Sequence, residues 1–317
     1  MGPTRSVFFI VNPVAGGGLA GRRWPRIQKQ ARRLLTPFQS AFTRGPGDAT
    51  HLARRALLEG ADILVCVGGD GTLGEMVTGM MDGTGPLRPD ALLGLISLGT
   101  GRDFIRTSRI PGEPEGALDV IAAGRSVPLD LGKISYVDRR GEQASRYFHN
   151  VASFGLGGEV DERVSRTTKI FGGFASFIWA TLLSVLRYRK KTIRLRIDDS
   201  PEETVAVMNV AVANGQYHGG GMWIAPEASL FDGLFHVTVI GDFSIPEVFR
   251  HLPKLYNGKL QQLEKVRILT GKKIEARSDE RVLLDVDGEQ AGILPVSLEI
   301  VPSALRIIIP QNPSLRL

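Results

Sequence analysis

A glycine-rich turn directly after a short apolar strand is the feature that most constrains this sequence. Residues 62–67 are apolar and rich in β-branched side chains, which predicts a buried strand. Residues 68–72 read Gly-Gly-Asp-Gly-Thr, and residues 73–81 have the pattern of a helix. Glycine lets the backbone approach a bulky group closely, and the N–H groups at a helix N-terminus bind phosphate. The order predicts a phosphate cradle; the alternative is a tight turn that simply needs glycine.

Three more predicted strands of the first half end in polar residues in the same way. They span residues 6–11, 38–42 and 91–97, and helical patterns cover residues 22–35 and 47–58. Alternating strands and helices predict a parallel sheet, which binds ligands beyond the carboxyl ends of its strands. The residues at these four ends are Asn12, Thr43, Asp70 and Thr100. We expect them to gather at one edge, where the Asp70 carboxylate would hold a cation beside a phosphate.

The pattern changes near Arg125, after which strands predominate. The predicted strands span residues 127–134, 145–151, 193–197, 204–213, 234–239, 265–270, 273–276, 282–286 and 296–300. Several alternate apolar and polar residues, which predicts an antiparallel sandwich or barrel. We therefore expect an α/β fold with a parallel-sheet nucleotide-binding domain over residues 1–126 and an antiparallel β-sandwich domain over residues 127–302. A last strand at residues 305–309 is expected to return to the first domain, which residues 303–317 would complete.

One apolar helix is predicted within the strand-rich half, over residues 170–187. It ends in the basic run Arg187-Tyr188-Arg189-Lys190-Lys191. One interpretation is a membrane-surface element whose basic end faces anionic lipid. The interpretation that we favour is a helix packed on the sheet, with cations placed favourably at its C-terminus.

Composition limits the partners and the compartment. The 317 residues are 43% apolar and 23% charged, with a net charge of +6 and a pI near 9.6. These values are typical of a globular protein of about two domains with anionic partners. The single cysteine, Cys66, lies in the predicted central strand, so no disulfide forms within the chain. Without a leader pattern or a long apolar run, we expect a cytoplasmic protein with no spanning helix.

Other chemistries lack their motifs in this sequence. The five histidines show no zinc-ligand spacing, and neither a Gly-x-Ser-x-Gly elbow nor a Walker-type Gly-Lys-Ser/Thr is present. The basic charge is not accompanied by a nucleic-acid-binding motif, so we do not expect nucleic acid as a partner.

With these features in hand, the chain resembles the diacylglycerol kinase catalytic family over essentially its whole length. It is most similar to the small soluble bacterial lipid kinases of that family. The motifs in the first half are Asn12-Pro13 with Gly16, Thr43 with Gly47-Asp48-Ala49, residues 68–72 with Glu75, and residues 98–104. Those in the second half are residues 152–155, 214–222, 224–226, 232–234 and 287–289. The second-half motifs separate this family from NAD kinases and phosphofructokinases, which have a similar glycine-rich element.

The resemblance implies phosphoryl transfer from ATP to a hydroxyl of diacylglycerol or a related lipid, with Mg²⁺. The nucleotide would be held by Asn12, Thr43, Gly68, Gly69, Asp70, Gly71, Thr72, Glu75 and Thr100. Asp70 would act on the phosphates through magnesium and water. Glu289 would take the proton from the lipid hydroxyl, and Asp103 is the third predicted catalytic residue. Because phosphoryl transfer depends mostly on positioning and charge neutralisation, a modest base suffices.

The resemblance also implies a separate structural metal. Asp232 would hold it together with backbone carbonyls of Ser229 and Leu234. The alternative for Asp232 and the glycine after it is an ordinary turn.

Asp287 and Glu289 are two residues apart, which leaves two arrangements open. On one strand they would share a face, where like charges raise a pKa and suit a base. In a hairpin, Asp287 and Gly288 would instead form the turn and leave Glu289 in solvent. Spacing alone does not decide between them, and the family resemblance favours Glu289 as the base.

Three positions depart from the pattern of the family. Arg102 stands where the family usually has asparagine, Gly74 also replaces asparagine, and His236 stands in a loop that usually carries another acid. Arginine is large and charged enough to pair with a phosphate or to hinder lipid entry. These changes leave ATP binding expected and the identity of the lipid open.

Three function hypotheses follow. The first is a lipid kinase that touches the membrane surface reversibly and peripherally; a homodimer is left open. The second is an NAD kinase-like enzyme with a soluble substrate, which predicts a second asparagine-rich motif that this sequence lacks. The third is a non-catalytic nucleotide or lipid sensor, which Arg102 and Gly74 would support.

Overall fold

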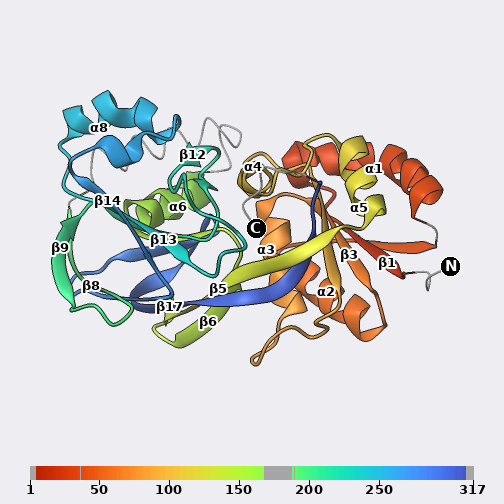
Figure 1. Ribbon diagram of the computed structural model, residues 1–317, viewed down its shortest axis with the longest axis horizontal. Helices are drawn as coiled ribbons and strands as arrows, with labels where there is room; N and C mark the ends of the chain where they lie inside the picture. The colour runs from red at the N-terminus through yellow and green to blue at the C-terminus, as the bar shows by residue number, and fades with distance from the viewer. Residues whose placement is uncertain (1–4, 36, 168–187, 189, 312–317) are drawn as a thin grey trace. The chain divides into compact units, whose positions relative to one another are not determined.

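The computed structural model describes residues 5–35, 37–167, 188 and 190–311, and the chain divides into two compact units (Figure 1). Unit 1 comprises the residues up to Leu131, the short segment Leu230–Asp232 and the residues from Val301 on. Unit 2 comprises Gly132–Ser229 and Gly233–Ile300. The helix expected over residues 170–187 lies outside the described residues, as does the end of the predicted segment 303–317.

Unit 1 is built on a parallel sheet. Its strands are β1 (Val7–Val11), β2 (Phe38–Phe42), β3 (Ile63–Gly68) and β4 (Leu92–Ser97), paired in the order β2–β1–β3–β4. Arg306 and Ile307, near the end of β17 (Glu289–Ile308), pair in parallel with β4. Every residue of β1, β3 and β4 is buried, and apart from Ser97 at the end of β4 the strands carry no polar side chain, as expected for a parallel sheet covered on both faces. The parallel α/β arrangement predicted for this part is confirmed.

The helices of unit 1 bury apolar stripes against one another and the sheet. They are α1 (Ala15–Leu34), α2 (Asp48–Leu58), α3 (Asp70–Met80), α4 (Asp103–Ser108) and α5 (Pro114–Ala123). α1 packs beside α5, and α2 beside α3 (Figure 1). The sequence did not predict α4 or α5, although Pro114 at the start of α5 and Gly124 after its end are helix boundary signals.

Unit 2 is formed mostly by antiparallel strands. They are β6 (Gln143–Phe148), β7 (Val151–Gly155), β8 (Lys191–Ile197), β9 (Glu203–Val207), β10 (Asn209–Ala213), β13 (Phe235–Ile240), β14 (Val266–Gly271), β15 (Lys273–Arg277) and β16 (Leu283–Val286). β14, β13, β10, β7 and β16 pair in that order, while β15 joins β17 to β8. The strands β5 (Ser126–Asp138) and β17 have residues in both units. The antiparallel β-rich second half predicted from the sequence is confirmed.

Aromatic and branched side chains fill the core of unit 2. Phe148 and Phe235 stack with their ring centroids 5.6 Å apart, and Phe154, Ile193 and Leu298 are fully buried in the same cluster. Since these residues come from β6, β13, β7, β8 and β17, the core joins strands that are distant in the sequence.

Several predicted strand boundaries were wrong. Residues 145–151 form two strands, β6 and β7, with a corner at His149 and Asn150. Residues 204–213 likewise divide into β9, which pairs with β8, and β10, which pairs with β7 and β13. An apolar run stays apolar through a change of partner strand, so hydrophobic periodicity alone does not locate these breaks.

Helical segments also cover parts of unit 2. They are α6 (Leu156–Thr167), α8 (Ile245–His251) and the 3₁₀ turns η1 (Leu252–Leu255) and η2 (Leu260–Gln262). The short strands β11 (Tyr217–His218) and β12 (Met222–Trp223) pair separately. None of the helices in the described part of the chain has the length and apolar stretch that a membrane crossing requires.

Candidate functional site

The glycine turns after β1, β3 and β4 meet at the carboxyl edge of the unit 1 sheet. A Cβ atom at Gly99 would lie 2.5 Å from Cα of Gly69, and one at Gly16 would overlap the carbonyl oxygen of Leu98. Gly16 also has a φ of 60°, which glycine adopts without strain. At these distances a side chain would not fit, so both positions require glycine. The turns that were predicted to converge therefore lie against one another.

Asn12 and Thr72 are joined directly at this edge. The side-chain amide of Asn12 donates to Oγ1 of Thr72 at 2.9 Å, and the backbone amide of Thr43 donates to the carbonyl of Val11. The structure therefore brings together three of the residues predicted to hold a nucleotide.

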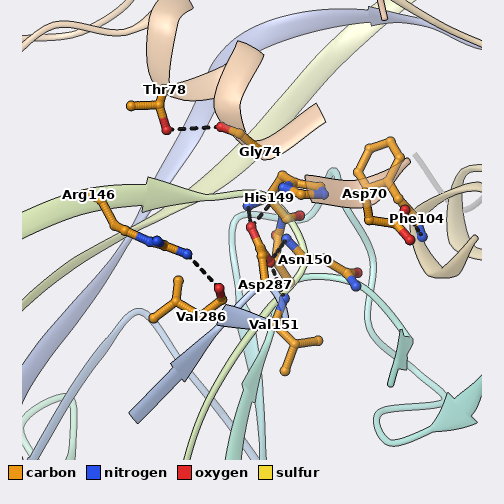
Figure 2. Close-up of polar contacts among 12 residues, drawn as sticks. Asp70, Gly74, Thr78, Phe104, Arg146, His149, Asn150, Val151, Val286 and Asp287 are labelled. Carbon is orange, nitrogen blue, oxygen red and sulfur yellow. Dashed lines mark hydrogen bonds and ion pairs between the residues drawn. The ribbon is translucent and has the colours of Figure 1, made fainter. Parts of the chain in front are cut away.

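Asp70 is the first residue of α3, where its negative charge is favourable near the helix N-terminus. Its carboxylate accepts a long hydrogen bond from the backbone amide of Asp103, at 3.3 Å. It accepts another from the backbone amide of Phe104, at 3.4 Å; Asp70 and Phe104 are drawn in Figure 2. Asp70 thereby holds the start of α4 beside the start of α3.

Asp103 is buried and lies close to the same point. A Cβ atom at Gly101 would lie 3.0 Å from Oδ2 of Asp70 and 3.7 Å from Oδ2 of Asp103. Oδ1 of Asp103 pairs with the Arg106 guanidinium at 2.7 Å. Two predicted catalytic carboxylates of unit 1 therefore face a single turn, residues 98–101.

These carboxylates fit a magnesium ion shared with bound phosphates. Magnesium in nucleotide sites takes one or two carboxylates, the phosphate oxygens and several waters. Among the described residues, no group of three or more His, Cys, Asp or Glu side chains could hold a metal by itself. Asp70 and Asp103 thus suit a cation that is also bound by nucleotide phosphates better than a metal site formed by protein ligands alone.

Gly71 lies in the first turn of α3 with nothing near it. Its φ is not in the left-handed region, and a Cβ atom there would meet no atom within 4 Å. Glycine inside a helix costs roughly 1 kcal/mol relative to alanine. Since the fold itself does not require glycine here, close approach of a ligand to the helix N-terminus is a physical reason for it.

Glu75, which was predicted to contact the nucleotide, instead forms hydrogen bonds with the backbone at the start of α2. Its two carboxylate oxygens accept the backbone amides of Gly47 at 2.8 Å and Ala49 at 3.1 Å. α2 has Gly47 at its N-cap and therefore lacks a capping side chain of its own. Glu75 supplies that cap from α3 and fixes the loop that follows Thr43; a direct contact with nucleotide stays a prediction.

Arg102 has the backbone conformation that asparagine and glycine adopt most easily. Its φ is 59° and its ψ 30°, immediately before α4 begins at Asp103. Arg102 therefore directly follows the turn, residues 98–101, that the two carboxylates face, and it is a position where the sequence departs from the family pattern.

In unit 2, the two residues between β16 and β17 form the turn of a hairpin. Asp287 and Gly288 have φ values of 52° and 84°, and Val286 pairs with Glu289 across the turn. Of the two arrangements left open by the sequence, the structure has the hairpin, and Asp287 and Glu289 do not share one strand face. The physical reason is that Asp-Gly is among the strongest two-residue turn formers.

The carboxylate of Asp287 is buried and fully used within unit 2. It accepts the backbone amides of His149, Asn150 and Val151, each at 3.0 Å, and lies 2.8 Å from Nδ1 of His149 (Figure 2). Burial by itself raises the pKa of Asp287, but the charge and hydrogen bonds of His149, with the charge of Arg146, lower it to about 2. Asp287 is thus a structural anion and a poor proton acceptor.

Glu289 extends from the other side of the turn. Its side chain is 62% exposed, and its carboxylate pairs with the Arg146 guanidinium at 3.0 Å. Arg146 also donates to the carbonyl of Val286 and so joins the same hairpin (Figure 2). Glu289 is accessible to a substrate, and its role as the base stays a prediction.

Sequence reasoning missed a second buried carboxylate, Asp285. Its Oδ2 lies 3.1 Å from Nε2 of His218 and 3.2 Å from Oγ of Ser153, and its Oδ1 accepts the amide of Gly288. The available signal was an acidic residue inside the otherwise apolar strand β16. Asp285 connects the hairpin to β7 and to the β11–β12 motif.

The residues predicted to hold a structural metal are divided between the units. Asp232 belongs to unit 1, and Ser229 and Leu234 belong to unit 2. The metal site at these residues stays a prediction.

Two family models match the chain and together cover most of it. A diacylglycerol kinase catalytic domain matches residues 6–134, and a YegS C-terminal NAD kinase beta sandwich-like domain matches residues 150–309. An α/β unit followed by a β-rich unit, together with these two matches, defines a kinase-type transferase.

The names of individual similar proteins define the family more narrowly. A protein of Staphylococcus aureus (strain JH9) named diacylglycerol kinase is 30% identical over 305 residues, which is 96% of this chain and 92% of that protein. A protein of Staphylococcus saprophyticus with the same name is 29% identical over 304 residues, covering 96% of this chain and 95% of that protein. The chain belongs to the diacylglycerol kinase family, as its motifs suggested, and use of ATP follows from this membership.

A solved structure shares the fold. The crystal structure of a diacylglycerol kinase from Bacillus anthracis str. Sterne aligns with a TM-score of 0.72 at 21% identity, covering 98% of each chain. At that identity the likeness shows the fold alone, and it agrees with the α/β and antiparallel arrangement described above.

Proposed function

We propose that this protein is an ATP-dependent lipid kinase that phosphorylates a hydroxyl of diacylglycerol or a related lipid. The observation that carries the proposal is the N-terminus of α3, where Gly71 lies open and Asp70 and Asp103 lie nearby. Family membership adds the kinase chemistry, and the curated relatives named diacylglycerol kinase support the lipid as acceptor.

In this proposal, the residues of unit 1 bind and orient the nucleotide. The first amides of α3 receive the phosphates, since the N–H groups of a first helical turn lack partners within the helix. Asn12, which holds Thr72, fixes the turn. Thr43 and Thr100 are the further residues that we propose contact the nucleotide. Bound magnesium would neutralise phosphate charge beside Asp70 and Asp103, which are the carboxylates that fit it.

In unit 2, Glu289 takes the proton of the attacking hydroxyl. Its exposure leaves the carboxylate within reach of a substrate, and its ion pair with Arg146 orients it. Asp287 and Asp285 act through the hairpin, because their buried hydrogen bonds hold the turn from which Glu289 extends. A lipid acceptor further requires reversible, peripheral contact with a membrane from the cytoplasmic side.

A transfer assay with γ-labelled ATP and a total lipid extract tests the proposal. We expect the label to enter one lipid band, the transfer to stop when a chelator removes divalent cations, and Asp70→Asn to lose most of the activity. NAD serves as the competing acceptor in a parallel reaction. Label in the water-soluble product, or no transfer to any acceptor despite ATP binding, would overturn the lipid kinase proposal in favour of an NAD kinase-like enzyme or a sensor.

A further inference from the structure

A helical segment on the surface of unit 2 presents a continuous apolar stripe to solvent. α8 and η1 follow each other without a break from Ile245 to Leu255. Ile245, Phe249 and Leu252 are spaced four and three residues apart, which places them on one side of a helix, and Tyr256 directly follows the segment. Their exposed fractions are 41%, 46%, 40% and 50%. An amphipathic helix usually buries such a stripe, and this one turns it outward.

The opposite side of the segment is firmly attached to unit 2. Leu255 and Phe243 pack against the buried cluster that contains Leu260, and the His251 ring meets the Phe243 ring at 5.9 Å. A capping box formed by Ser244 and Glu247 begins the helix, and Glu247 pairs with Lys265 at 2.8 Å. The orientation of the stripe is therefore set by packing on its reverse side.

The same stretch of chain carries basic side chains. Arg250 and Lys254 lie on the segment itself, and Lys259 follows it. Within the part of the chain that the structure describes, no carboxylate forms an ion pair with these three residues, whereas Glu247 is already neutralised by Lys265. The surface thus combines exposed apolar side chains with uncompensated positive charge.

We propose that this surface, formed by Ile245, Phe249, Leu252 and Tyr256 with Arg250 and Lys254, docks the protein on an anionic lipid membrane. Apolar and aromatic side chains beside Lys and Arg are the chemistry of helices that lie in the membrane interface. A helix of this length extends about 16 Å, so one stripe falls short of the roughly 800 Å² per partner in a stable protein interface.

This inference deepens the proposed function, on which it rests for its biological purpose, because a lipid acceptor lies in a membrane. It assigns the contact to a described surface rather than to the helix predicted over residues 170–187. Binding to vesicles can be measured without any turnover. A protein that binds vesicles but transfers no phosphate to lipid would overturn the proposed function and leave the docking surface standing.

The test is co-sedimentation of the full chain with vesicles of phosphatidylglycerol and phosphatidylcholine. Replacing the stripe with Phe249→Ser and Leu252→Ser is expected to lower the vesicle partition coefficient about tenfold or more, since each apolar side chain contributes to insertion. Leu58→Ser removes a leucine that is 73% exposed on α2 and is the matched control, expected to bind like the unaltered protein.

A second pair of variants tests the charge. Arg250→Gln with Lys254→Gln is expected to lower the partition coefficient about tenfold on phosphatidylglycerol-containing vesicles, with little change on pure phosphatidylcholine. Lys29→Gln with Arg33→Gln, at the same spacing on exposed α1 positions, is the control. If the serine variant fails to fold, the charge variant and its control still test whether this surface binds anionic lipid.

Two results would overturn the inference. One is vesicle binding of the folded stripe or charge variant equal to that of the unaltered protein. The other is a dimer in analytical ultracentrifugation that the stripe variant converts to a monomer without loss of vesicle binding, which would make the surface an interface between two copies of the chain.

Discussion

Nδ1 of His149 lies 2.8 Å from Oδ2 of Asp287, and both side chains are buried. The same carboxylate accepts the backbone amides of Asn150 and Val151, while the side chain of Asn214 donates to the carbonyl of His149. One acidic side chain in a hairpin turn therefore fixes the corner between β6 and β7. The turn also carries Glu289, so the position of the predicted base depends on this buried contact.

Asp287→Asn is expected to lower the free energy of unfolding at neutral pH by about 3–5 kcal/mol, the usual cost of breaking a buried charged network. The neutral side-chain amide of asparagine accepts hydrogen bonds from three backbone amides less strongly than a carboxylate does, and its NH₂ group is a donor that cannot accept any of them. Urea unfolding of the two proteins measures the difference. Asp90→Asn, at an exposed position, is the control and should stay within about 0.5 kcal/mol.

The pH dependence of that difference has a definite sign. The pKa of Asp287 is about 2 in the folded protein and lies below its ordinary value of 3.8, so ionisation favours the folded state. The stabilisation is complete above pH 4, and about 2 kcal/mol of it is lost as the pH falls from about 4 to about 2. The gap between the two proteins should narrow over this range; a gap that stays constant would show that Asp287 keeps its ordinary pKa.

Gly71→Ala is expected to separate stability from nucleotide binding. The backbone is already helical and a methyl group would meet nothing, so the free energy of unfolding should rise by about 0.5–1 kcal/mol. The KM for ATP should rise about tenfold or more, because the methyl group enters the space proposed for phosphate. Thermal unfolding and initial rates measure the two effects, and an unchanged KM would mean that no phosphate lies over Gly71.

Arg102→Asn should stabilise the protein, because Asn tolerates a φ of 59° better than Arg does. We expect a gain of about 0.5–1 kcal/mol by urea unfolding. Arg109→Gly replaces the other arginine at a φ of 59°, at the far end of α4, and should stabilise by a similar amount without changing the KM for ATP. A loss of stability in Arg102→Asn would show that the arginine side chain makes contacts worth more than the backbone strain.

The sequence predicted unit 1 well because its signals are local. Each buried strand runs directly into its own glycine turn, as at β3 and Gly69, so the shared edge at which the turns meet follows from the pattern alone. The role of Glu75 could not be predicted in this way. Its partners Gly47 and Ala49 belong to another helix, and only the packing of α2 beside α3 brings them to its carboxylate.

Unit 2 shows more clearly which contacts cannot be predicted from the sequence. The Asp287-Gly288 turn can be predicted from two residues. Asp287 also accepts a hydrogen bond from the backbone amide of Val151, however, and that residue lies 136 residues earlier in the chain. Asp285 and His218 likewise meet only in the folded chain, because β16 and β11 belong to two different sheets. Periodicity identifies a buried strand but gives neither its neighbours nor the purpose of an acidic residue within it.

Glu289→Gln tests the proposed base with little structural disturbance. The side chain is 62% exposed and its single described ion pair, with Arg146, is of the kind worth about 0–1 kcal/mol, so the fold should persist. We expect kcat with a lipid acceptor to fall by roughly 10²–10⁴, the usual contribution of a general base, while the Kd for ATP stays unchanged. Glu299→Gln, on an exposed position of the same strand, is the control for lost charge and should keep normal turnover. Near-normal turnover in Glu289→Gln would remove this residue from the mechanism, and since Asp287 is already committed to three amides, the proton would then have to leave by another acceptor.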